Sequence, residues 1–381
     1  MHKYLSTLLL LAPFFGFSQE KLSFQKTDSL TYQYYLQGEW KQMIGLTMDA
    51  FKQDIDSKYL RQRAGYAYYM TGDYTSAEIE YKKALEFDTA DEITREYLYY
   101  CAANSGSEYS RFYAGNLSEE TASKLGIKRI NPVEMVDTEF NIKTNQTESR
   151  SNQIYYRFGI NTELGYRLSL YQSLSYFNQT VDGIPTRQPE YLALLKWHFA
   201  PAWQLKTAYH YLYTNDGYNV YPGNLGFLAL SSKLNRFTLE ARGSILKSSF
   251  ATTRQVGLQA GVVLPGKSNL YLTSALTGMA EDGEYRTIFS QSAGLKCNKK
   301  LWAEGNITLG NLKNYNTYNS LYVYNSVDPS VFRTGFSLFY FTGKHLSFTG
   351  NFTFDQQQIE NSTTITHYYQ YSFSGGIKWR L

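Results

Sequence analysis

Residues 261–268 read GVVLPGKS and fit the GxxxxGKS pattern of phosphate-binding loops at every fixed position. Such a loop lies between a strand and a helix, because the amide groups at the helix N-terminus hold the phosphates. Here Leu270, Leu272 and Leu276 follow the motif in alternation with Tyr271 and threonines, which predicts a strand. We therefore interpret the segment as a tight turn between two strands and expect no nucleotide chemistry.

The histidines are the other candidates for chemistry; those after residue 18 lie at positions 198, 210, 345 and 367. His198 and His210 lie on neighbouring predicted strands, on either side of a turn at Ala200-Pro201. Some membrane barrels are hydrolases or acyltransferases in which a histidine works with a serine or an acidic residue, so a barrel enzyme is one hypothesis. The plainer interpretation of His210, which shares a face with Lys206, is a lumen residue, and we predict no catalytic residue.

Metal, cofactor and nucleic-acid binding find no support in the sequence. The histidines lack metal-binding spacing, and the two cysteines, Cys101 and Cys297, lie in segments that we assign to different domains. We therefore expect no disulfide, metal site or cofactor. The net charge of +4 and the lack of a block of basic residues argue against nucleic acid as a partner.

The most regular spacing in the chain is at its end. Residues 367–381 read HYYQYSFSGGIKWRL, with apolar side chains at odd positions and polar ones mostly between them. A strand with this alternation has one apolar and one polar face, and the alternation recurs from residue 132 onward. We therefore predict an antiparallel transmembrane β-barrel for residues 132–381, whose outer face contacts membrane lipid. On the closing strand, this face consists of Tyr369, Tyr371, Phe373, Ile377, Trp379 and Leu381.

The first residues predict export. Residues 1–18 combine Lys3, an apolar stretch from residue 4 to residue 17, and small residues at Gly16 and Ser18, as in a signal peptide that is cut before Gln19. An N-terminal anchor helix is the alternative, but the apolar stretch is shorter than the ~20 residues that a membrane-spanning helix needs. We expect residues 1–18 to be removed.

Residues 19–128 have an apolar period of 3.6, which is typical of helices. Within residues 59–91, the offsets between small and aromatic residues are those of a tetratricopeptide repeat, a helix–turn–helix unit of about 34 residues. Small residues let the two helices approach closely, a glycine at the turn permits positive φ, and tyrosines fill the space between the helices. A generic helical bundle is the alternative; in either case we predict a periplasmic domain that docks a protein partner. The repeat residues are Gly65, Tyr68, Gly72, Ala77, Tyr81 and Ala84.

Turn residues divide the barrel region into about 14 strands, with roughly 12 or 16 as alternatives, because residues 315–324 could form a hairpin inside a loop. Short turns alternate with longer polar loops, as in outer-membrane barrels, whose periplasmic turns are tight and whose outer loops are long. An even strand count places both barrel ends, and with them the helical domain, on the periplasmic side. Short turns are expected near residues 164–165, 200–201, 234–235, 265–266, 298–299 and 343–344, and long loops near residues 145–152, 178–189, 215–223, 248–253, 280–284, 311–330 and 355–366.

The alternation also assigns charged residues to the face that lines the lumen. Both signs occur, so the charges could pair across a narrow bore and partly block it. They could equally line a weakly anion-preferring pore, because basic residues predominate. We favour the narrow or partly blocked lumen. The residues expected there are Arg157, Glu163, Arg167, Lys196, Lys206, Glu240, Arg242, Glu304, Arg333, Lys378 and Arg380.

The export signal, the repeat residues between positions 65 and 84 and the aromatic closing strand together resemble the YaiO-like outer-membrane proteins and related proteins that join repeats to a barrel. The closing strand is similar to the signal that the bacterial barrel-insertion machinery reads, with Leu381 in place of the more usual Phe. The resemblance implies an α+β multidomain chain in the bacterial outer membrane, with its N-terminal domain in the periplasm. It carries no catalytic residues.

These observations lead to three functional hypotheses. We favour a non-enzymatic outer-membrane barrel whose periplasmic domain docks a partner in envelope assembly, secretion or surface polysaccharide handling. A channel or transporter for a small solute is the first alternative. A hydrolase or acyltransferase embedded in the barrel is the second.

Overall fold

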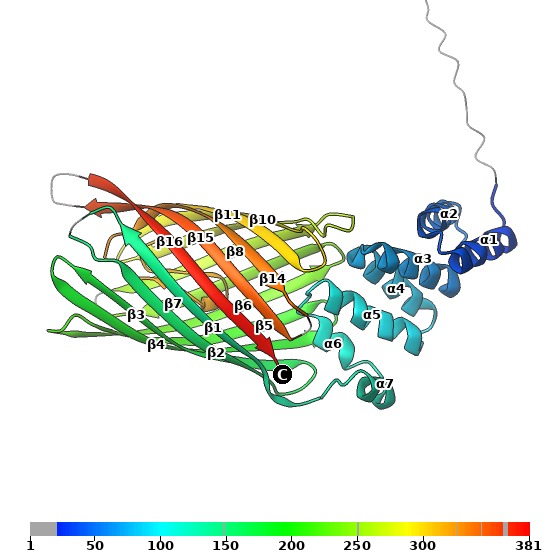
Figure 1. Ribbon diagram of the computed structural model, residues 1–381, viewed down its shortest axis with the longest axis horizontal. Helices are drawn as coiled ribbons and strands as arrows, with labels where there is room; N and C mark the ends of the chain where they lie inside the picture. Colours follow the sequence, from blue (N-terminus) through cyan, green and yellow to red (C-terminus); the bar gives the residue numbers. More distant parts are fainter. Residues whose placement is uncertain (1–20, 148, 250, 326, 344, 361–364) are drawn as a thin grey trace, which may run out of the picture.

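The computed structural model describes residues 21–381 except Glu148, Phe250, Ser326, Lys344 and residues 361–364. A helical region is followed by a closed antiparallel barrel of fourteen strands (Figure 1). This confirms the predicted fold class and strand number. The predicted signal peptide, residues 1–18, lies outside the described residues.

The described part of the chain contains seven α-helices before the barrel. They are α1 (Phe24–Gln37), α2 (Trp40–Lys52), α3 (Lys58–Thr71), α4 (Tyr74–Phe87), α5 (Glu92–Asn104), α6 (Ser110–Ala114) and α7 (Glu119–Lys124). α3 begins after Ser57, whose side chain accepts a hydrogen bond from the Leu60 N–H, and ends at Gly72 in the left-handed conformation with φ 85°. Asp73 then caps α4 by accepting from the Ser76 N–H. The predicted helix–turn–helix unit is therefore the hairpin of α3 and α4.

This hairpin depends on a close approach of the two helices. Gly65 of α3 faces the ring of Tyr81 on α4, and a Cβ at Gly65 would lie 2.9 Å from that ring. Tyr81 is 1 % exposed, Ala77 and Ala84 of the same helix are fully buried, and Tyr68 packs against this core. The predicted repeat residues thus occupy the helix–helix contact and its turn, while the assignment to the tetratricopeptide family stays a prediction.

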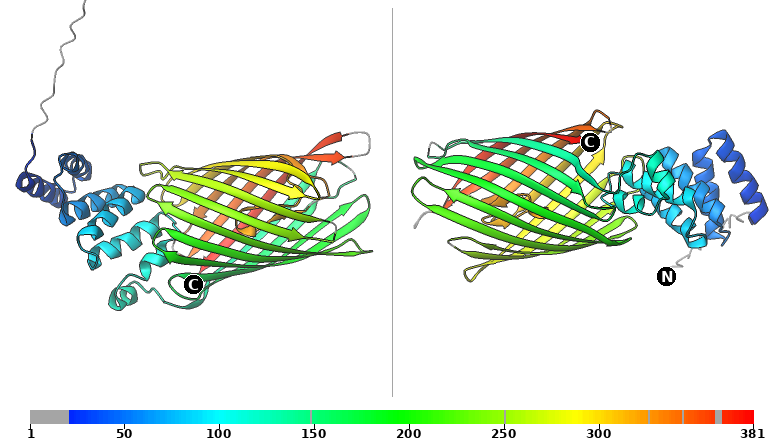
Figure 2. Two further views of the ribbon diagram at one scale, coloured as in Figure 1. Left: turned by 180° about the vertical axis from the view of Figure 1, so that it is seen from behind. Right: turned by 90° about the horizontal axis from the view of Figure 1, so that it is seen from below.

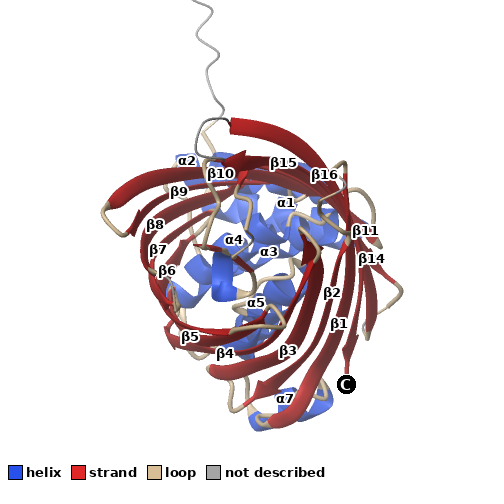
Figure 3. Cartoon of the chain, turned by 90° about the vertical axis from the view of Figure 1, so that its left-hand side faces the viewer, coloured by secondary structure: helices blue, strands red, loops and turns tan. Residues whose placement is uncertain are grey.

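The barrel strands follow one another in chain order, and the last strand pairs with the first to close the sheet (Figure 3). In the closing pair the register runs from Met135 opposite Arg380 to Asn145 opposite Gln370. A closed sheet has no free edge, so each strand has a neighbour on both sides. The strands are β1 (Asn131–Asn145), β2 (Gln153–Glu163), β3 (Leu168–Val181), β4 (Ile184–Ala200), β5 (Trp203–Asn215), β6 (Val220–Leu234), β7 (Phe237–Lys247), β8 (Thr252–Val263), β9 (Tyr271–Glu281), β10 (Glu284–Lys296), β11 (Leu301–Leu309), β14 (Ser330–Phe341), β15 (Leu346–Glu360) and β16 (Ile365–Arg380).

Side chains alternate between an outer face and a lumen face. On β16, Phe373 and Trp379 are 53 % and 56 % exposed, whereas Gln370 and Ser372 are 1 % and 2 % exposed. Among the described residues, no helix is long and apolar enough to cross a membrane. Every barrel strand places at least one large apolar side chain on the exposed face: Phe140, Phe158, Leu174, Trp197, Tyr209, Leu228, Leu239, Val256, Leu276, Phe289, Leu309, Phe336, Phe352 and Phe373.

The predicted short turns lie at the end of the barrel that faces the helices (Figure 2). The other end differs from the prediction, because two of the expected long loops are two-residue turns, Asp182-Gly183 and Asp282-Gly283. All four residues have positive φ, which matches the twist of the paired strands. The strands on either side of these turns continue beyond the part of the barrel wall whose outer face is apolar. Their polar composition there resembles that of loops, and for this reason the sequence predicted loops.

Residues 310–329 connect β11 to β14, and we call this segment the lumen loop. It contains β12 (Tyr315–Asn316) and β13 (Val323–Tyr324), which pair in a separate two-stranded sheet, with the 3₁₀ turn η1 (Tyr318–Ser320) between them. This is the hairpin inside a loop that the sequence left open. The barrel wall therefore has fourteen strands and not sixteen.

We predict that Gly65→Ala destabilises the helical region by about 1–3 kcal/mol, because the new methyl group meets the buried ring of Tyr81. Thermal unfolding of the full chain in detergent, followed by circular dichroism at a helix-sensitive wavelength, measures the change. Gly45→Ala in α2 is the control, because a Cβ there has no neighbour within 4 Å and should stabilise the helix by up to ~1 kcal/mol. Equal effects of the two substitutions would contradict the prediction.

Candidate functional site

Charged side chains inside the barrel pair with one another, either within one strand or with a residue one or two strands away. Five of the predicted lumen residues take part, each with an opposite charge close by. Burying a charge inside a barrel costs free energy unless the charge is paired, so these contacts offset the desolvation cost of the lumen charges. The nitrogen–oxygen distances are 2.8 Å for Arg157–Glu139, 3.2 Å for Lys206–Glu240, 3.9 Å for Arg242–Glu240 and 3.3 Å for Arg333–Asp355.

Other predicted lumen residues lie towards the short-turn end. Arg167 requires a correction: it lies in the turn between β2 and β3, where its guanidinium is 5.1 Å from the ring centroid of Phe112 in α6. Alternation does not apply there, because the turn leaves the sheet to contact the helices. Lys196 binds Glu108, and Glu163 pairs with Arg111 at 3.4 Å, so both contact the helical region. Glu304 accepts a hydrogen bond from Tyr271. On β16, Arg380 pairs with Glu134 at 3.4 Å, and Lys378 is exposed.

The lumen loop is hydrogen-bonded to the barrel wall on several sides. The side-chain amide of Gln255 on β8 makes two bonds of 2.8 Å with the backbone of Asn316. His210 on β5 lies 2.8 Å from the carbonyl oxygen of Ser320 through Nδ1. These contacts hold the middle of the loop inside the bore.

The end of the loop is fixed near the outer rim and against β1. Arg150 binds the carboxylate of Asp328 at 2.7 and 3.2 Å, and the Tyr368 hydroxyl donates to the same carboxylate at 2.8 Å. Tyr322 donates to Glu139 on β1, a strand on the opposite side of the barrel from β8. The loop is therefore tied across the bore, as expected for a partly blocked lumen.

His210 has no arrangement for acid–base catalysis on a serine. Its Nδ1 faces the Ser320 carbonyl and its Nε2 lies 3.2 Å from the Glu190 carboxylate. The Ser175 hydroxyl donates to Glu190 at 2.9 Å and not to the imidazole. A general base needs a free ring nitrogen that faces the nucleophile, and both nitrogens of His210 face other acceptors. Among the described residues, His210 thus acts as an anchor for the lumen loop.

The connection between α5 and α6 enters the short-turn mouth of the barrel. Its Glu108 binds Lys196 and lies 3.7 Å from Lys206, which is 2 % exposed inside the barrel. Burial opposes ionisation of Glu108, but the two lysines outweigh it and hold the pKa of this carboxyl well below its usual range. Next to it, the ring of Tyr109 packs edge-on against His198, with 4.8 Å between the centroids.

A second group of contacts fixes α4 to the barrel turns. Glu78, which is 3 % exposed, lies 2.7 Å from Lys233 and 2.8 Å from Lys82. Burial alone would raise the pKa of Glu78, but the two ammonium groups lower it to about 2. Asp73 accepts a hydrogen bond of 2.9 Å from the backbone N–H of Gly266. The GKS segment therefore connects two strands, as predicted, but the connection spans residues 264–270 and is longer than a tight turn. It serves as a docking point for the helices.

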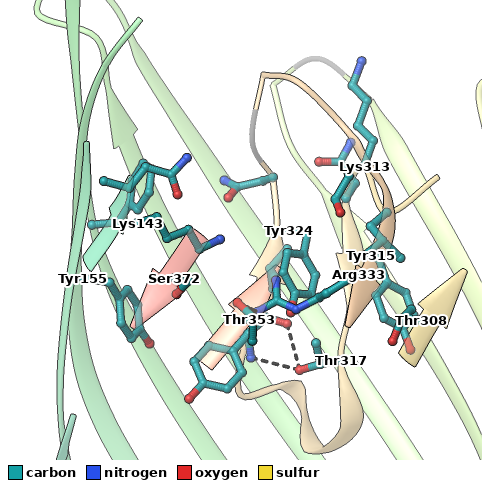
Figure 4. Close-up of a pocket in the computed structure, with 18 of the residues that line it drawn as sticks. Lys143, Tyr155, Thr308, Lys313, Tyr315, Thr317, Tyr324, Arg333, Thr353 and Ser372 are labelled. Atoms are coloured by element: carbon teal, nitrogen blue, oxygen red, sulfur yellow. Dashed lines mark hydrogen bonds between the residues drawn. The ribbon is translucent and has the colours of Figure 1, made fainter. Parts of the chain in front are cut away.

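A cavity of about 1120 Å³ lies between the lumen loop and the wall. Residues of the outer turns, among them Asp182 and Asp282, belong to its lining, so it reaches the end opposite the helices. Figure 4 shows Lys143 of β1 and Arg333 of β14 on either side of Tyr324. The Lys143 ammonium is 6.0 Å and the Arg333 guanidinium 4.9 Å from the centroid of that ring.

Several residues of this site were missed from the sequence. Lys143 alternates with Asn141 and Asn145 on the lumen face of β1, and this pattern could have found it. Glu108 lies in the irregular connection between α5 and α6, where neither a helical nor a strand period predicts which way a side chain points. Asp328 follows the loop hairpin and binds a residue far away in the chain, so no local signal exists.

Comparisons with known proteins give fold-level likeness alone. No family model matches the chain, and no curated protein matches it. Among solved structures, a bacterial polysaccharide outer-membrane secretin is similar at 8 % identity and a TM-score of 0.43, over 66 % of this chain and 99 % of that one. The toluene transporter TodX of P. putida is similar at 8 % identity and a TM-score of 0.45, over 66 % of this chain and 91 % of that one. Omp33 of Acinetobacter baumannii is similar at 10 % identity and a TM-score of 0.38, over 66 % of this chain and 99 % of that one. Values this low assign no function to this chain.

We predict that Glu78→Gln lowers the stability of the docked helical region by about 3 kcal/mol at neutral pH. The folded-state pKa of about 2 lies below the ordinary 4.5, so the stabilisation is present above pH 4.5 and is lost as the pH falls towards 2. Helix unfolding of the full chain, measured between pH 7 and pH 2, should show a gap between wild type and variant that closes at the acid end. Glu120→Gln should change little, because the Glu120 side chain is 77 % exposed and pairs with Lys124 at the surface. A gap independent of pH would contradict the prediction.

Proposed function

We propose that this protein is a non-enzymatic outer-membrane barrel whose lumen is closed at rest and whose helical domain docks a periplasmic protein. The apolar side chains on the outer face of every strand support a lipid environment. Exposed aromatic residues near the short-turn end, including Trp197, Trp203 and Trp379, suit a membrane–water interface. The longest connection of the barrel, residues 310–329, begins at the end away from the helices, where outer-membrane barrels have their long outer loops, and this supports a periplasmic position for the helical domain.

The observation that carries the closed state is the anchoring of the lumen loop. Its contacts reach β1, β5 and β8, so it crosses the bore and does not hang at the rim. Glu108 of the helical region approaches the same bore from the other end, next to Lys206. A permanently open pore would need both segments elsewhere.

A tyrosine-rich surface supports the docking role. Tyr32, Tyr66 and Tyr100 occur 34 residues apart on α1, α3 and α5, and Tyr35 and Tyr69 repeat at the same interval. Tyr32 is 50 % and Tyr35 40 % exposed. Tyrosine combines an apolar ring with a polar tip, which is common where proteins bind one another.

These rings form a continuous series of contacts towards the barrel, which we call the tyrosine ladder. Tyr35 contacts Tyr66, Tyr66 contacts Tyr97, and Tyr97 contacts Tyr69, with centroids 5.3, 5.6 and 5.5 Å apart. Tyr69 then lies 5.5 Å from Tyr74, whose ring is 5.2 Å from the ammonium of Lys296 at the end of β10. A partner on the ladder would therefore lie close to the barrel mouth.

A gated channel for a small solute is the second candidate. The cavity of about 1120 Å³ beside the lumen loop favours it, because displacement of that loop would extend an existing space along the bore. In this case the lumen loop is the gate.

We predict that the wild-type chain gives no steady conductance in a planar bilayer, because the lumen loop crosses the bore. Replacement of residues 314–325 by a short Gly-Ser linker should produce discrete conductance steps. The control replaces residues 216–219, the turn between β5 and β6, in the same way, and should stay silent. Steady conductance of the wild type would overturn the closed resting state and favour an open channel.

We predict that the double substitution Tyr32→Ser, Tyr35→Ser removes a specific periplasmic protein from those that the full-length chain captures in detergent-solubilised envelopes. Quantitative mass spectrometry of the captured proteins measures the loss. Leu36→Ser is the matched control, because Leu36 is 65 % exposed on the same helix but is not in the tyrosine ladder. Identical captured sets from wild type and double variant would contradict docking through this surface.

A further inference from the structure

The outward-facing cavity contains a cationic group, the Lys143 ammonium, that forms no direct ion pair with the described residues. Lys143 makes no hydrogen bond or ion pair with any described residue, and its contact is with the Tyr324 ring. Arg333, on the other side of that ring, shares its charge with Asp355 at 3.3 Å. An ammonium group inside a barrel loses much of its hydration, so a bound anion would be stabilised beside it.

The wall around Lys143 is built from amides and hydroxyls. Cross-strand pairs line it, with donor–acceptor distances between 2.7 and 3.0 Å: Asn141–Ser372, Gln153–Gln179 and Gln357–Gln370. Such groups both donate and accept hydrogen bonds, as the hydroxyl groups of sugars do. They match a hydroxyl-rich ligand better than an apolar one.

One of the lining residues has a polar side-chain atom without a partner. Gln357 is 4 % exposed, and its Oε1 makes no hydrogen bond with any described residue. Buried polar atoms without partners are rare in folded proteins, and this one belongs to a residue of the cavity wall.

The volume and position narrow the ligand class further. The cavity, at about 1120 Å³, is larger than the ~300–1,000 Å³ that small-molecule pockets occupy, so it has room for several sugar units. Its lining includes residues of the outer turns, on the side away from the helical domain. We infer that this vestibule binds a short segment of an acidic saccharide from the outer side, with Lys143 at its carboxylate and the amide and hydroxyl pairs at its hydroxyls.

This inference goes beyond the docking role and requires neither an open pore nor a periplasmic partner. Isothermal titration calorimetry on the full-length protein in detergent tests it with a mannuronate tetrasaccharide, with maltotetraose as the neutral probe of equal length. We expect the acidic probe to bind at least about tenfold more tightly than the neutral one. Lys143→Gln should weaken it by about tenfold or more, as the loss of a charge-assisted hydrogen bond predicts.

The control is Lys378→Gln, which removes another lysine of the barrel that does not belong to the cavity lining and should leave affinity unchanged. Heat-dependent migration in gel electrophoresis reports whether each variant has a folded barrel. If Lys143→Gln does not fold, Tyr324→Leu tests the same site, because it removes the ring beside the ammonium, and it should also weaken the acidic probe. Equal binding of both probes, no binding of either, or unchanged affinity in the folded Lys143 or Tyr324 variant would overturn the inference. A silent bilayer or a failed capture experiment would not affect it.

Discussion

The pairing of β1 with β16 is the constraint on which the structure depends. Once these strands pair, every strand of the sheet is hydrogen-bonded to a neighbour on both sides, which is the condition for crossing a membrane with strands. The closed sheet leaves a side chain only two directions, outwards or into the bore. Large apolar groups point outwards on each strand, and the charged groups of the lumen therefore have to find their partners inside. Pairs such as Arg157–Glu139 and Lys206–Glu240 follow from this geometry.

A barrel of fourteen strands is wider than its own inward side chains can fill, because bore diameter increases with strand number. The lumen loop occupies part of the remaining space, and its contacts with the wall are polar. The side-chain amide of Gln255, for example, donates one hydrogen bond to the backbone of Asn316 and accepts one from it, and so replaces water at the backbone of β12. The result is a bore that the loop crosses, with a cavity between the loop and the wall and the helical region at the opposite mouth.

The fold could be predicted because its signals are local. Strict alternation on residues such as Tyr369 and Phe373, and turn residues such as Pro265-Gly266, depend only on near neighbours in the chain. The outer turns at Asp182 and Asp282 were misjudged because strands beyond the apolar band have the composition of loops. The contacts of the lumen loop could not be predicted at all.

Those contacts join residues 61 positions apart in Gln255–Asn316 and 178 apart in Arg150–Asp328. Which residues meet depends on bore width and on how far the loop reaches, and neither quantity has a period in the sequence. The same holds for the helical region: Gly65 and Tyr81 could be predicted as packing residues, but the placement of Glu108 beside Lys206 depends on how two domains meet.

Lys206 is where the two parts of the protein share a charge. Its ammonium lies 3.2 Å from Glu240 of the barrel wall and 3.7 Å from Glu108 of the helical region. A movement of the helices that withdrew Glu108 would leave one carboxylate less around a lysine that is 2 % exposed, and the lumen charges would have to rearrange. His210, four residues further along the same strand, anchors the lumen loop. A partner that displaced the helical domain would therefore act on β5 directly, the strand that carries both the docking charge and a loop anchor.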